Sequence, residues 1–462
     1  MERRLTKSLP TNSNVPLRRL GQVELIAAGG AFIAPAFSLA AIFAAIALTG
    51  GAVAPFGVVL GTLAALLAAG CFAAMSRRFP RAGGAYALVG AVLPRPLSFL
   101  AGWSLALLYL LGPAIPLALV AGGLGFFFPA LAPYFFLLAV GISVLVFAIN
   151  ASGVRPSTRV ALLLFVGEIA VLLGIALLLF SHTSAPAPSS TGAVGVLHAL
   201  GGSAAAAVFL YLGFDSVSTY GEEAHLPRKQ IAVGTLAALG LTAVVYVVCS
   251  LAFLYAIPSS VFASNPSLSD AVTGVLGPAG GDLIAAVIVI SSMGALIAVE
   301  NACSRSLFAM GRDGVLPVPL ARLMGREKTP RPALAFSAAI SVVLVGWSLV
   351  SQGPLAAPRG FLSSILPGML VFGALVAYGL VSVAYLVTLG REGALRRHPL
   401  RCLLPAGAAV VSGVLLVLQV LPGTPGSSQV LWGAGVWLVI GFSLWGATRA
   451  LRPAAVTQLQ PA

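Results

Sequence analysis

The stretch GSAAAAVFLYLGFDSVST, residues 202–219, decides the fold class because it carries an acid, Asp215, inside a run apolar enough to cross a membrane. A carboxylate at the centre of a membrane helix costs about 2.5–3.5 kcal/mol, so it must face a protein interior or a water-filled path. Gly213 weakens the helix just before the acid and lets the backbone open. An acid beside a helix break at membrane depth predicts a substrate or ion site.

The composition of the whole chain indicates a membrane protein. Of the 462 residues, 59% are hydrophobic and 8% are charged, whereas soluble domains carry about 25% charged residues. A helix needs about 20 apolar residues to span a bilayer. We therefore predict an all-α polytopic membrane protein with twelve transmembrane helices. The predicted spans are 22–49, 51–74, 97–127, 132–150, 160–180, 200–220, 232–257, 281–310, 332–350, 363–388, 402–421 and 429–448.

The basic residues are distributed asymmetrically along these spans. With the amino terminus inside, all 26 Lys and Arg residues except Arg359 fall in segments predicted to be cytoplasmic. This is the positive-inside pattern of membrane proteins. The net charge of +14 therefore reflects how the chain is oriented in the lipid bilayer, and it does not indicate binding of nucleic acid. The same pattern predicts that both termini are cytoplasmic.

The chain reads as one membrane domain, 17–450, between a disordered cytoplasmic tail, 1–16, and a second cytoplasmic tail, 451–462. Its four cysteines lie in apolar spans or at their ends and lack the spacing of metal ligands. We read them as small apolar residues and expect neither a metal site nor a cofactor. These cysteines are Cys71, Cys249, Cys303 and Cys402.

The first and sixth spans share an interruption near their midpoints. Pro35 interrupts 22–49, and Gly213 interrupts 200–220. Two broken helices that lie five spans apart are typical of inverted repeats with a binding site between them. The pattern therefore predicts two five-helix repeats.

Four motifs follow in order along the chain. They are FPRAGGAY at 79–86, AGW at 101–103, YLGFDSVSTYGEEAHLPR at 211–228 and SRSLFAMGRDGVLP at 304–317. Together they resemble the amino acid–polyamine–organocation (APC) superfamily of permeases, and the third resembles bacterial relatives of the cationic amino acid transporters. The resemblance extends from about residue 20 to the end of the last span.

The resemblance implies the leucine-transporter-type fold. Helices 1–5, about 20–180, and helices 6–10, about 198–390, would form a 5+5 inverted repeat, with two further helices at 402–448. Helices 1 and 6 would be unwound around a substrate site at the midplane. A member of this family is a transporter and not an enzyme, and we expect it in the cytoplasmic membrane of a bacterium as a monomer or homodimer.

In the sixth span, Phe209 and Tyr211 precede the break at Gly213 and resemble the family positions that cover the substrate side chain. Ordinary packing is the alternative for both aromatic residues. Asp215 is a candidate to bind a proton or to pair with a cation, and capping of the second half-helix is compatible with either role.

The first span departs from the family pattern Gly-(Ser/Ala)-Gly-Ile-Phe, whose bare amides hold a substrate carboxylate. The corresponding stretch is 35–39, PAFSL, and a second register would use 28–32, AGGAF. A proline removes a donor and breaks the helix without a glycine. This departure argues against a plain α-amino-acid substrate. In the first register the candidate substrate-binding residues are Ala34, Pro35, Ala36, Phe37 and Ser38.

Further polar residues extend the candidate site. Glu168 stands where many relatives carry a lysine on the fifth helix, so it could hold a proton or serve as a structural carboxylate. Ser291 lies about one turn before the positions at which sodium-coupled members of the family carry hydroxyl ligands, which favours the proton over sodium. Glu300 is a second candidate for coupling or for contacts between helices. Charged residues at the inner helix ends predict a cytoplasmic gate: Glu222, Glu223, Arg305 and Arg312.

The sequence thus predicts a secondary transporter of amino acids or related amines that works by alternating access with the proton as coupling ion. The alternative is a permease or exchanger for polyamines or other organic cations, without recognition of a carboxylate. The residues leave open the substrate, uptake versus exchange, and the register of the first-span motif.

Overall fold

The computed structural model describes residues 16–182, 193–257, 261–262, 267–352, 362, 365–420 and 427–450. The predicted tails at 1–16 and 451–462 lie outside these ranges apart from Pro16, and so does Arg359. The described part of the chain is built from helices, with two isolated β-bridges and no strand.

The first half of the chain forms eight α-helices and three short η segments, which are 3₁₀ or π helices. They are α1 (Gln22–Ile33), α2 (Pro35–Gly50), η1 (Gly51–Val53), α3 (Ala54–Arg78), α4 (Gly84–Gly90), α5 (Arg95–Ala106), η2 (Leu107–Leu111), α6 (Ala114–Phe127), η3 (Pro129–Tyr134), α7 (Phe135–Ala151) and α8 (Val154–Phe180).

The second half follows the same all-helical plan. Its elements are α9 (Ala193–Ala207), η4 (Val208–Tyr211), η5 (Phe214–Tyr220), α10 (Pro227–Ala256), α12 (Leu268–Arg312), η6 (Val318–Ala321), α13 (Arg331–Gln352), α14 (Leu366–Arg391), α15 (Ala394–Arg397), η8 (Pro399–Cys402), α16 (Leu403–Val420) and α17 (Ser427–Ala450).

Eleven helical runs in the described residues are long and apolar enough to cross a membrane. The sequence predicts twelve spans, and the difference lies in the run Gln22–Arg78, which is 57 residues long and contains both predicted spans 22–49 and 51–74. Gly51, with φ of +48°, turns the chain between α2 and α3 so tightly that the helical run continues through η1. The whole is an integral membrane protein of many apolar helices.

One helix begins earlier than the sequence predicts. α12 starts at Leu268 rather than near 281, because helical structure continues on both sides of a kink at Gly277. Gly277 has φ of +75°, and the following Pro278 cannot donate a backbone hydrogen bond. α12 thus consists of two helices that meet at this kink, and together they span 45 residues.

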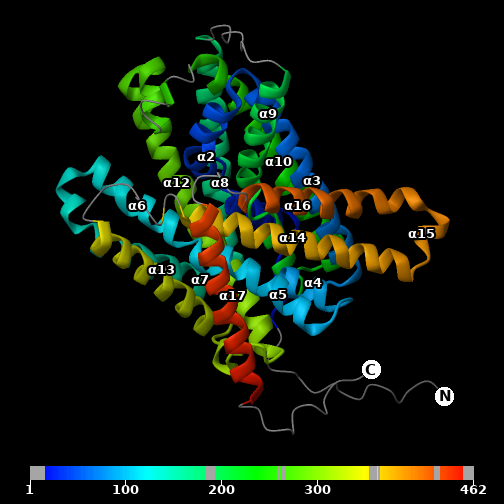
Figure 1. Cartoon of the computed structure of the whole chain (residues 1–462). Helices are drawn as coiled ribbons and strands as arrows, with labels where there is room; N and C mark the ends of the chain where they lie inside the picture. The colour runs from blue at the N-terminus through cyan, green and yellow to red at the C-terminus, as the bar shows by residue number, and fades with distance from the viewer. Residues whose placement is uncertain are drawn as a thin grey trace, which may run out of the picture.

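The helices differ in how deeply they are buried. In the most apolar part of the run Arg95–Phe127, 89% is buried inside the protein. The corresponding share is 17% for Pro399–Val420 and 22% for Ser427–Ala450. Figure 1 shows α14 and α16 side by side, joined through α15, with α17 running steeply downward from the left end of α14. The central helices therefore surround the candidate site, while α16 and α17 lie on the outside.

Aromatic packing fixes α17 against α5. The Trp103 and Trp437 rings stack with centroids 4.5 Å apart. Each indole N–H donates to the backbone carbonyl of the other tryptophan, both at 2.8 Å. Buried indoles need such partners, so this reciprocal pair satisfies both donors and holds the peripheral helix in register.

Candidate functional site

The first interruption of a helix occurs at Ala34. α1 ends at Ile33, Ala34 adopts a left-handed conformation with φ of +48°, and α2 starts with Pro35. Proline has no N–H and clashes with the preceding turn, which explains the break. The Ile33 carbonyl accepts the Ser38 hydroxyl at 2.7 Å and the Tyr246 hydroxyl at 3.4 Å. The stretch 35–39 thus starts at the break, whereas 28–32 lies inside α1.

The second interruption separates η4 from η5. Leu212 is extended, with ψ of 131°, and Gly213 has φ of +107°. A Cβ atom on Gly213 would lie 1.9 Å from Cδ1 of Phe32. Glycine is therefore required twice, for the backbone angle and for the approach of the α1 ring. The two breaks meet at this contact.

Asp215 lies in the first turn of η5 and is completely buried. Its carboxylate accepts hydrogen bonds from the Tyr378 hydroxyl at 2.6 Å and from the Tyr109 hydroxyl. Tyr109 belongs to η2, the π-helical turn at Leu107–Leu111, and Tyr378 belongs to α14. One carboxylate thus ties together three membrane segments.

Glu168 on α8 is the second buried acid near the breaks, with 1% of its surface exposed. Its Oε2 accepts the backbone N–H of Ala36 at 3.3 Å, and the Ser291 hydroxyl oxygen accepts the next N–H along the chain, that of Phe37, at 3.1 Å. The acid therefore contacts the start of α2 directly, at the positive end of the helix dipole.

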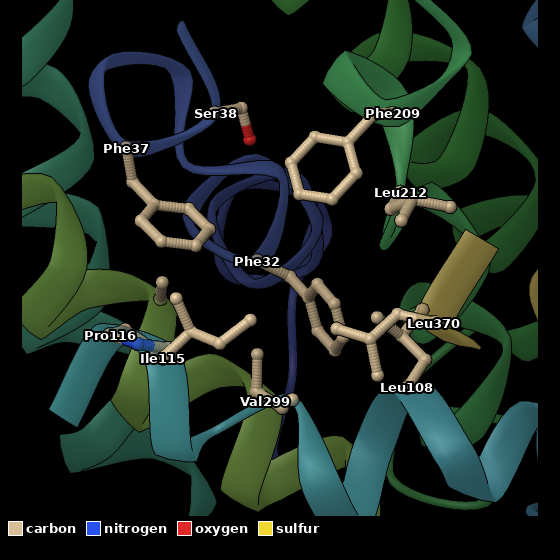
Figure 2. A pocket seen from close by; sticks show the side chains of 12 residues that line it. Phe32, Phe37, Ser38, Leu108, Ile115, Pro116, Phe209, Leu212, Val299 and Leu370 are labelled. Carbon is tan, nitrogen blue, oxygen red and sulfur yellow. The ribbon is translucent and has the colours of Figure 1, made fainter. Parts of the chain in front are cut away.

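A small cavity lies between the breaks (Figure 2). Its volume is about 40 Å³, enough for about three water molecules. Among the described residues that line it, Ser38 alone has a polar side chain. The cavity is lined by Phe32, Phe37, Ser38, Leu108, Gly112, Ile115, Pro116, Phe209, Leu212, Ala295, Val299 and Leu370.

Figure 2 shows where the predicted substrate-binding residues stand relative to this cavity. Phe37, Ser38 and Phe209 line it. Tyr211 does not, because its hydroxyl pairs with Thr62 of α3 and its ring packs edge-on against Tyr246. Ala34, Pro35, Ala36 and Gly213 shape the backbone around the cavity without lining it.

Glu300 stands apart from the cavity, fully buried on α12. Within the described part of the chain, neither of its carboxyl oxygens makes a well-formed hydrogen bond. The neighbouring Asn301 is well bonded, since its amide donates to the Asn150 side chain at 2.6 Å and to the Ser157 hydroxyl at 3.1 Å. Glu300 is therefore an uncompensated buried acid beside a satisfied amide network.

The predicted gate residues form two ion pairs at one end of the helices. Arg305 donates to both oxygens of Glu223, at 2.7 and 3.1 Å, and its guanidinium lies 4.6 Å from the centre of the Tyr220 ring. Arg312 donates to both oxygens of Glu222 at 2.8 Å. Each pair joins α12 to the segment that follows η5.

The Glu222–Arg312 pair is only partly shielded from solvent. Burial acts to raise the pKa of the Glu222 carboxyl, but the Arg312 guanidinium and the Ala82 N–H together outweigh it, so the pKa is lowered. The backbone near Leu20 joins the same cluster, because the N–H groups of Arg19 and Leu20 donate to the Glu223 carbonyl. These contacts tie the segment after η5 to α12 and to the residues before α1.

The sequence did not predict the roles of three residues that organise the site: Tyr109 and Tyr378 as donors to Asp215, and Ser291 as an acceptor at the first break. Each tyrosine is a polar group in an otherwise apolar stretch, which is the signal that could have indicated it. The π-helical turn at η2 has no such signature, although π-bulges are frequent at functional sites.

In the part of the chain that the structure describes, no group of three or more His, Cys, Asp or Glu side chains lies close enough together to hold an ion. The four cysteines are free and buried.

Apolar membrane helices, two helix breaks facing a small cavity, and buried acids beside it define a membrane transporter as the class of protein. A family model described as "amino acid permease" matches residues 20–444. The chain therefore belongs to the amino acid permease family of the APC superfamily, whose members are permeases and not enzymes.

Three relatives illustrate the range of the family. The chain is 30% identical to a methylthioribose transporter of Bacillus subtilis, over 81% of this chain and 82% of the relative. It is 28% identical to a branched-chain amino acid permease of the same species, over 86% of each chain. It is also similar to a low-affinity putrescine importer of Escherichia coli, with 26% identity over 94% of each chain.

Proposed function

We propose that this protein is a secondary active transporter that moves amino acids or related amines across the cytoplasmic membrane of a bacterium by alternating access. The observation that carries the proposal is the close approach of Phe32, two residues before the break at Ala34, to Gly213 at the second break, beside the cavity that Phe32 lines. Broken helices supply backbone groups that bind polar parts of a substrate. The named activities of the relatives, which concern methylthioribose, branched-chain amino acids and putrescine, are consistent with it.

The proposed architecture has twelve crossings, cytoplasmic termini and a 5+5 inverted repeat in which helices 1 and 6 are unwound. The run Gln22–Arg78 supports twelve crossings, because 57 helical residues would extend about 86 Å and the bilayer core is about 30 Å thick. The breaks at Ala34 and Gly213 support the repeat.

The proposed coupling ion is the proton, with Asp215 and Glu168 as its carriers and Glu300 as a further candidate. Both Asp215 and Glu168 are buried and bonded to groups on other membrane segments. Protonation of a carboxylate removes acceptor capacity, so it would loosen the contacts of Asp215 with α14 or of Glu168 with α2. Such a change links proton binding to helix movement.

The proposed cytoplasmic gate consists of Glu222, Glu223, Arg305 and Arg312. In the described state both ion pairs are formed. Opening the cavity toward the cytoplasm would require them to separate, since they join α12 to the segment after η5.

A second candidate function is transport or exchange of polyamines or other organic cations. Two buried acids next to the helix breaks favour a cationic substrate, because a carboxylate is stabilised by an opposite charge. The putrescine importer among the relatives is consistent with this candidate.

The test is uptake into proteoliposomes with an imposed pH gradient, using labelled amino acids and amines. Asp215→Asn and Glu168→Gln are expected to reduce uptake or to flatten its pH dependence. Asp282→Asn, at an exposed position on α12, serves as the control and should behave as the unmodified protein. Wild-type uptake by both variants at every pH would refute the coupling mechanism.

A further inference from the structure

The amino-terminal end of α2 faces the cavity, and its backbone donors already have partners. The first N–H groups of a helix have no acceptor within the helix and normally bind side chains, water or a ligand. Pro35 contributes no N–H group. The N–H of Ala36 donates to Oε2 of Glu168 at 3.3 Å. The first available donor of α2 is therefore used by the protein itself.

The next two donors are used as well. The N–H of Phe37 donates to the Ser291 hydroxyl oxygen at 3.1 Å, and the N–H of Ser38 donates to the Ala34 carbonyl at 2.9 Å. Counting along the described start of α2, no backbone N–H group remains for a ligand. Glu168 and Ser291 accept from consecutive N–H groups, so the two side chains together cap the start of α2.

Both members of this cap are built into the core. Glu168 and Ser291 are each 1% exposed, and they come from α8 and α12. A carboxylate next to free helix N–H groups is the arrangement that a helix amino terminus favours for an anionic ligand. Here the chain supplies that carboxylate through Glu168.

The lining of the cavity fits the same view. Eleven of its twelve lining residues are apolar or glycine, and the hydroxyl of the twelfth, Ser38, donates its hydrogen to the Ile33 carbonyl. A substrate carboxylate in this cavity would lose its water, find no free amide on α2, and approach the Glu168 carboxyl group. Burial of an unpaired carboxylate is strongly unfavourable, and like charges at close range add to the cost.

We propose that Glu168 is a specificity-determining residue that occupies the carboxylate position at the start of α2, so that the substrate of this cavity is a carboxylate-free molecule with an apolar body. The inference rests on the proposed function, because it takes the cavity as the transport site. It assigns Glu168 a role in selecting the substrate that is separate from proton coupling.

The direct test of the cap uses formate with the purified full-length protein and needs no knowledge of the substrate. Glu168→Ala removes the acceptor of the Ala36 N–H and leaves space for a small carboxylate. Formate is expected to raise the melting temperature of Glu168→Ala and to leave those of the unmodified protein and of Asp282→Ala, at an exposed position on α12, unchanged. Equal responses of all three proteins would overturn the role of Glu168 as a built-in carboxylate.

The test of selectivity compares each amino acid with its decarboxylated amine, such as phenylalanine with phenethylamine and leucine with isopentylamine, and includes methylthioribose as a neutral probe. In the unmodified protein the carboxylate-free members should bind more tightly. Glu168→Ala should shift the affinity ratio toward the amino acid by about tenfold or more, since a hydrogen bond to a charged group is worth about 1.5–3 kcal/mol. Asp282→Ala should leave the ratio unchanged.

The outcomes separate this inference from the proposed function. Amino acids that bind the unmodified protein as tightly as their amines would refute the inference and leave transport of amino acids intact. If no probe binds or is transported, the proposed substrate range is wrong, and the formate experiment alone decides the role of Glu168. If Glu168→Ala does not fold, Glu168→Gln replaces it in the test, because this variant keeps an acceptor for the Ala36 N–H but loses the charge. Glu168→Gln should bind amino acids better than the unmodified protein does. Equal binding would overturn the inference.

Discussion

Asp215 and Glu300 are both fully buried acids, but their surroundings differ. Asp215 accepts hydrogen bonds from Tyr109 and Tyr378, whereas among the described residues Glu300 makes no well-formed hydrogen bond. A charged acceptor stabilises its neighbours by about 1.5–3 kcal/mol per hydrogen bond. An acid without partners contributes only the cost of its burial. Although the two acids are equally buried, we therefore expect replacement by the neutral amide to affect the free energy of unfolding differently at the two positions.

At neutral pH, Asp215→Asn is expected to lower the free energy of unfolding by about 1–3 kcal/mol, because one tyrosine loses a charged acceptor. Glu300→Gln is expected to leave this free energy unchanged or to raise it. Thermal unfolding in detergent measures both variants side by side. A loss of stability in Glu300→Gln as large as that in Asp215→Asn would mean that Glu300 has a partner that stabilises it.

Gly213 allows a second expectation at the residue scale. Gly213→Ala places a methyl group at a positive φ and against the Phe32 ring, which we expect to cost about 2–5 kcal/mol from backbone strain and overpacking combined. Because Phe32 lines the cavity, ligand binding should weaken too. Gly240→Ala in α10 is the matched control, since a Cβ there meets nothing within 4 Å. If both alanine variants have the same stability and ligand affinity, the close approach of Phe32 is not required.

At the scale of elements, two ion pairs with similar bidentate geometry differ in burial. Arg305–Glu223 joins α12 to the segment after η5, with 4% and 7% of the side chains exposed, while Arg78–Glu392 joins α3 to the end of α14, with 31% and 47% exposed. Removing one partner of a buried pair leaves an uncompensated charge and costs about 3–5 kcal/mol. An exposed pair contributes about 1 kcal/mol or less.

Arg305→Ala is therefore expected to destabilise the protein by about 3–5 kcal/mol, and Arg78→Ala by about 1 kcal/mol or less. The double variant Arg305→Ala/Glu223→Ala should be more stable than the sum of the single variants implies, because no charge is left alone. Unfolding of the four proteins gives the coupling free energy. Additive effects of Arg305→Ala and Glu223→Ala would show that the pair does not act as a unit.

The Glu222–Arg312 pair predicts a dependence of stability on pH. The pKa of Glu222 is lower in the folded protein than its ordinary value of 4.5. The pair therefore stabilises the fold fully above pH 4.5, and this contribution is lost as the pH falls through the lowered folded pKa. Between pH 7 and pH 3, the unmodified protein should lose more stability than Glu222→Gln, by about 1–2 kcal/mol. Parallel pH profiles would exclude a role for this carboxyl.

At the scale of the molecule, periodicity and composition predicted most of what the structure contains, because long apolar runs have few alternatives in a bilayer. The helix breaks were predictable because Pro35 and Gly213 act locally on the backbone. The partners of the buried acids were not. Tyr378 lies 163 residues from Asp215 along the chain, and Ala36 lies 132 residues from Glu168. Such contacts depend on how helices pack, which no local pattern encodes.

The orientation of the whole molecule gives the last prediction. If the run Gln22–Arg78 crosses the membrane twice, the turn at Ala52 lies outside with His182, and Lys229 lies inside. Ala52→Cys and His182→Cys should then react with an impermeant thiol reagent on intact cells, and Lys229→Cys only after permeabilisation. The native cysteines give little background because they are buried. A run that crosses once would place Ala52 within the bilayer and shield it in both conditions, and it would put His182 and Lys229 on the opposite sides from those predicted. The labelling pattern of these three positions therefore distinguishes twelve crossings from eleven.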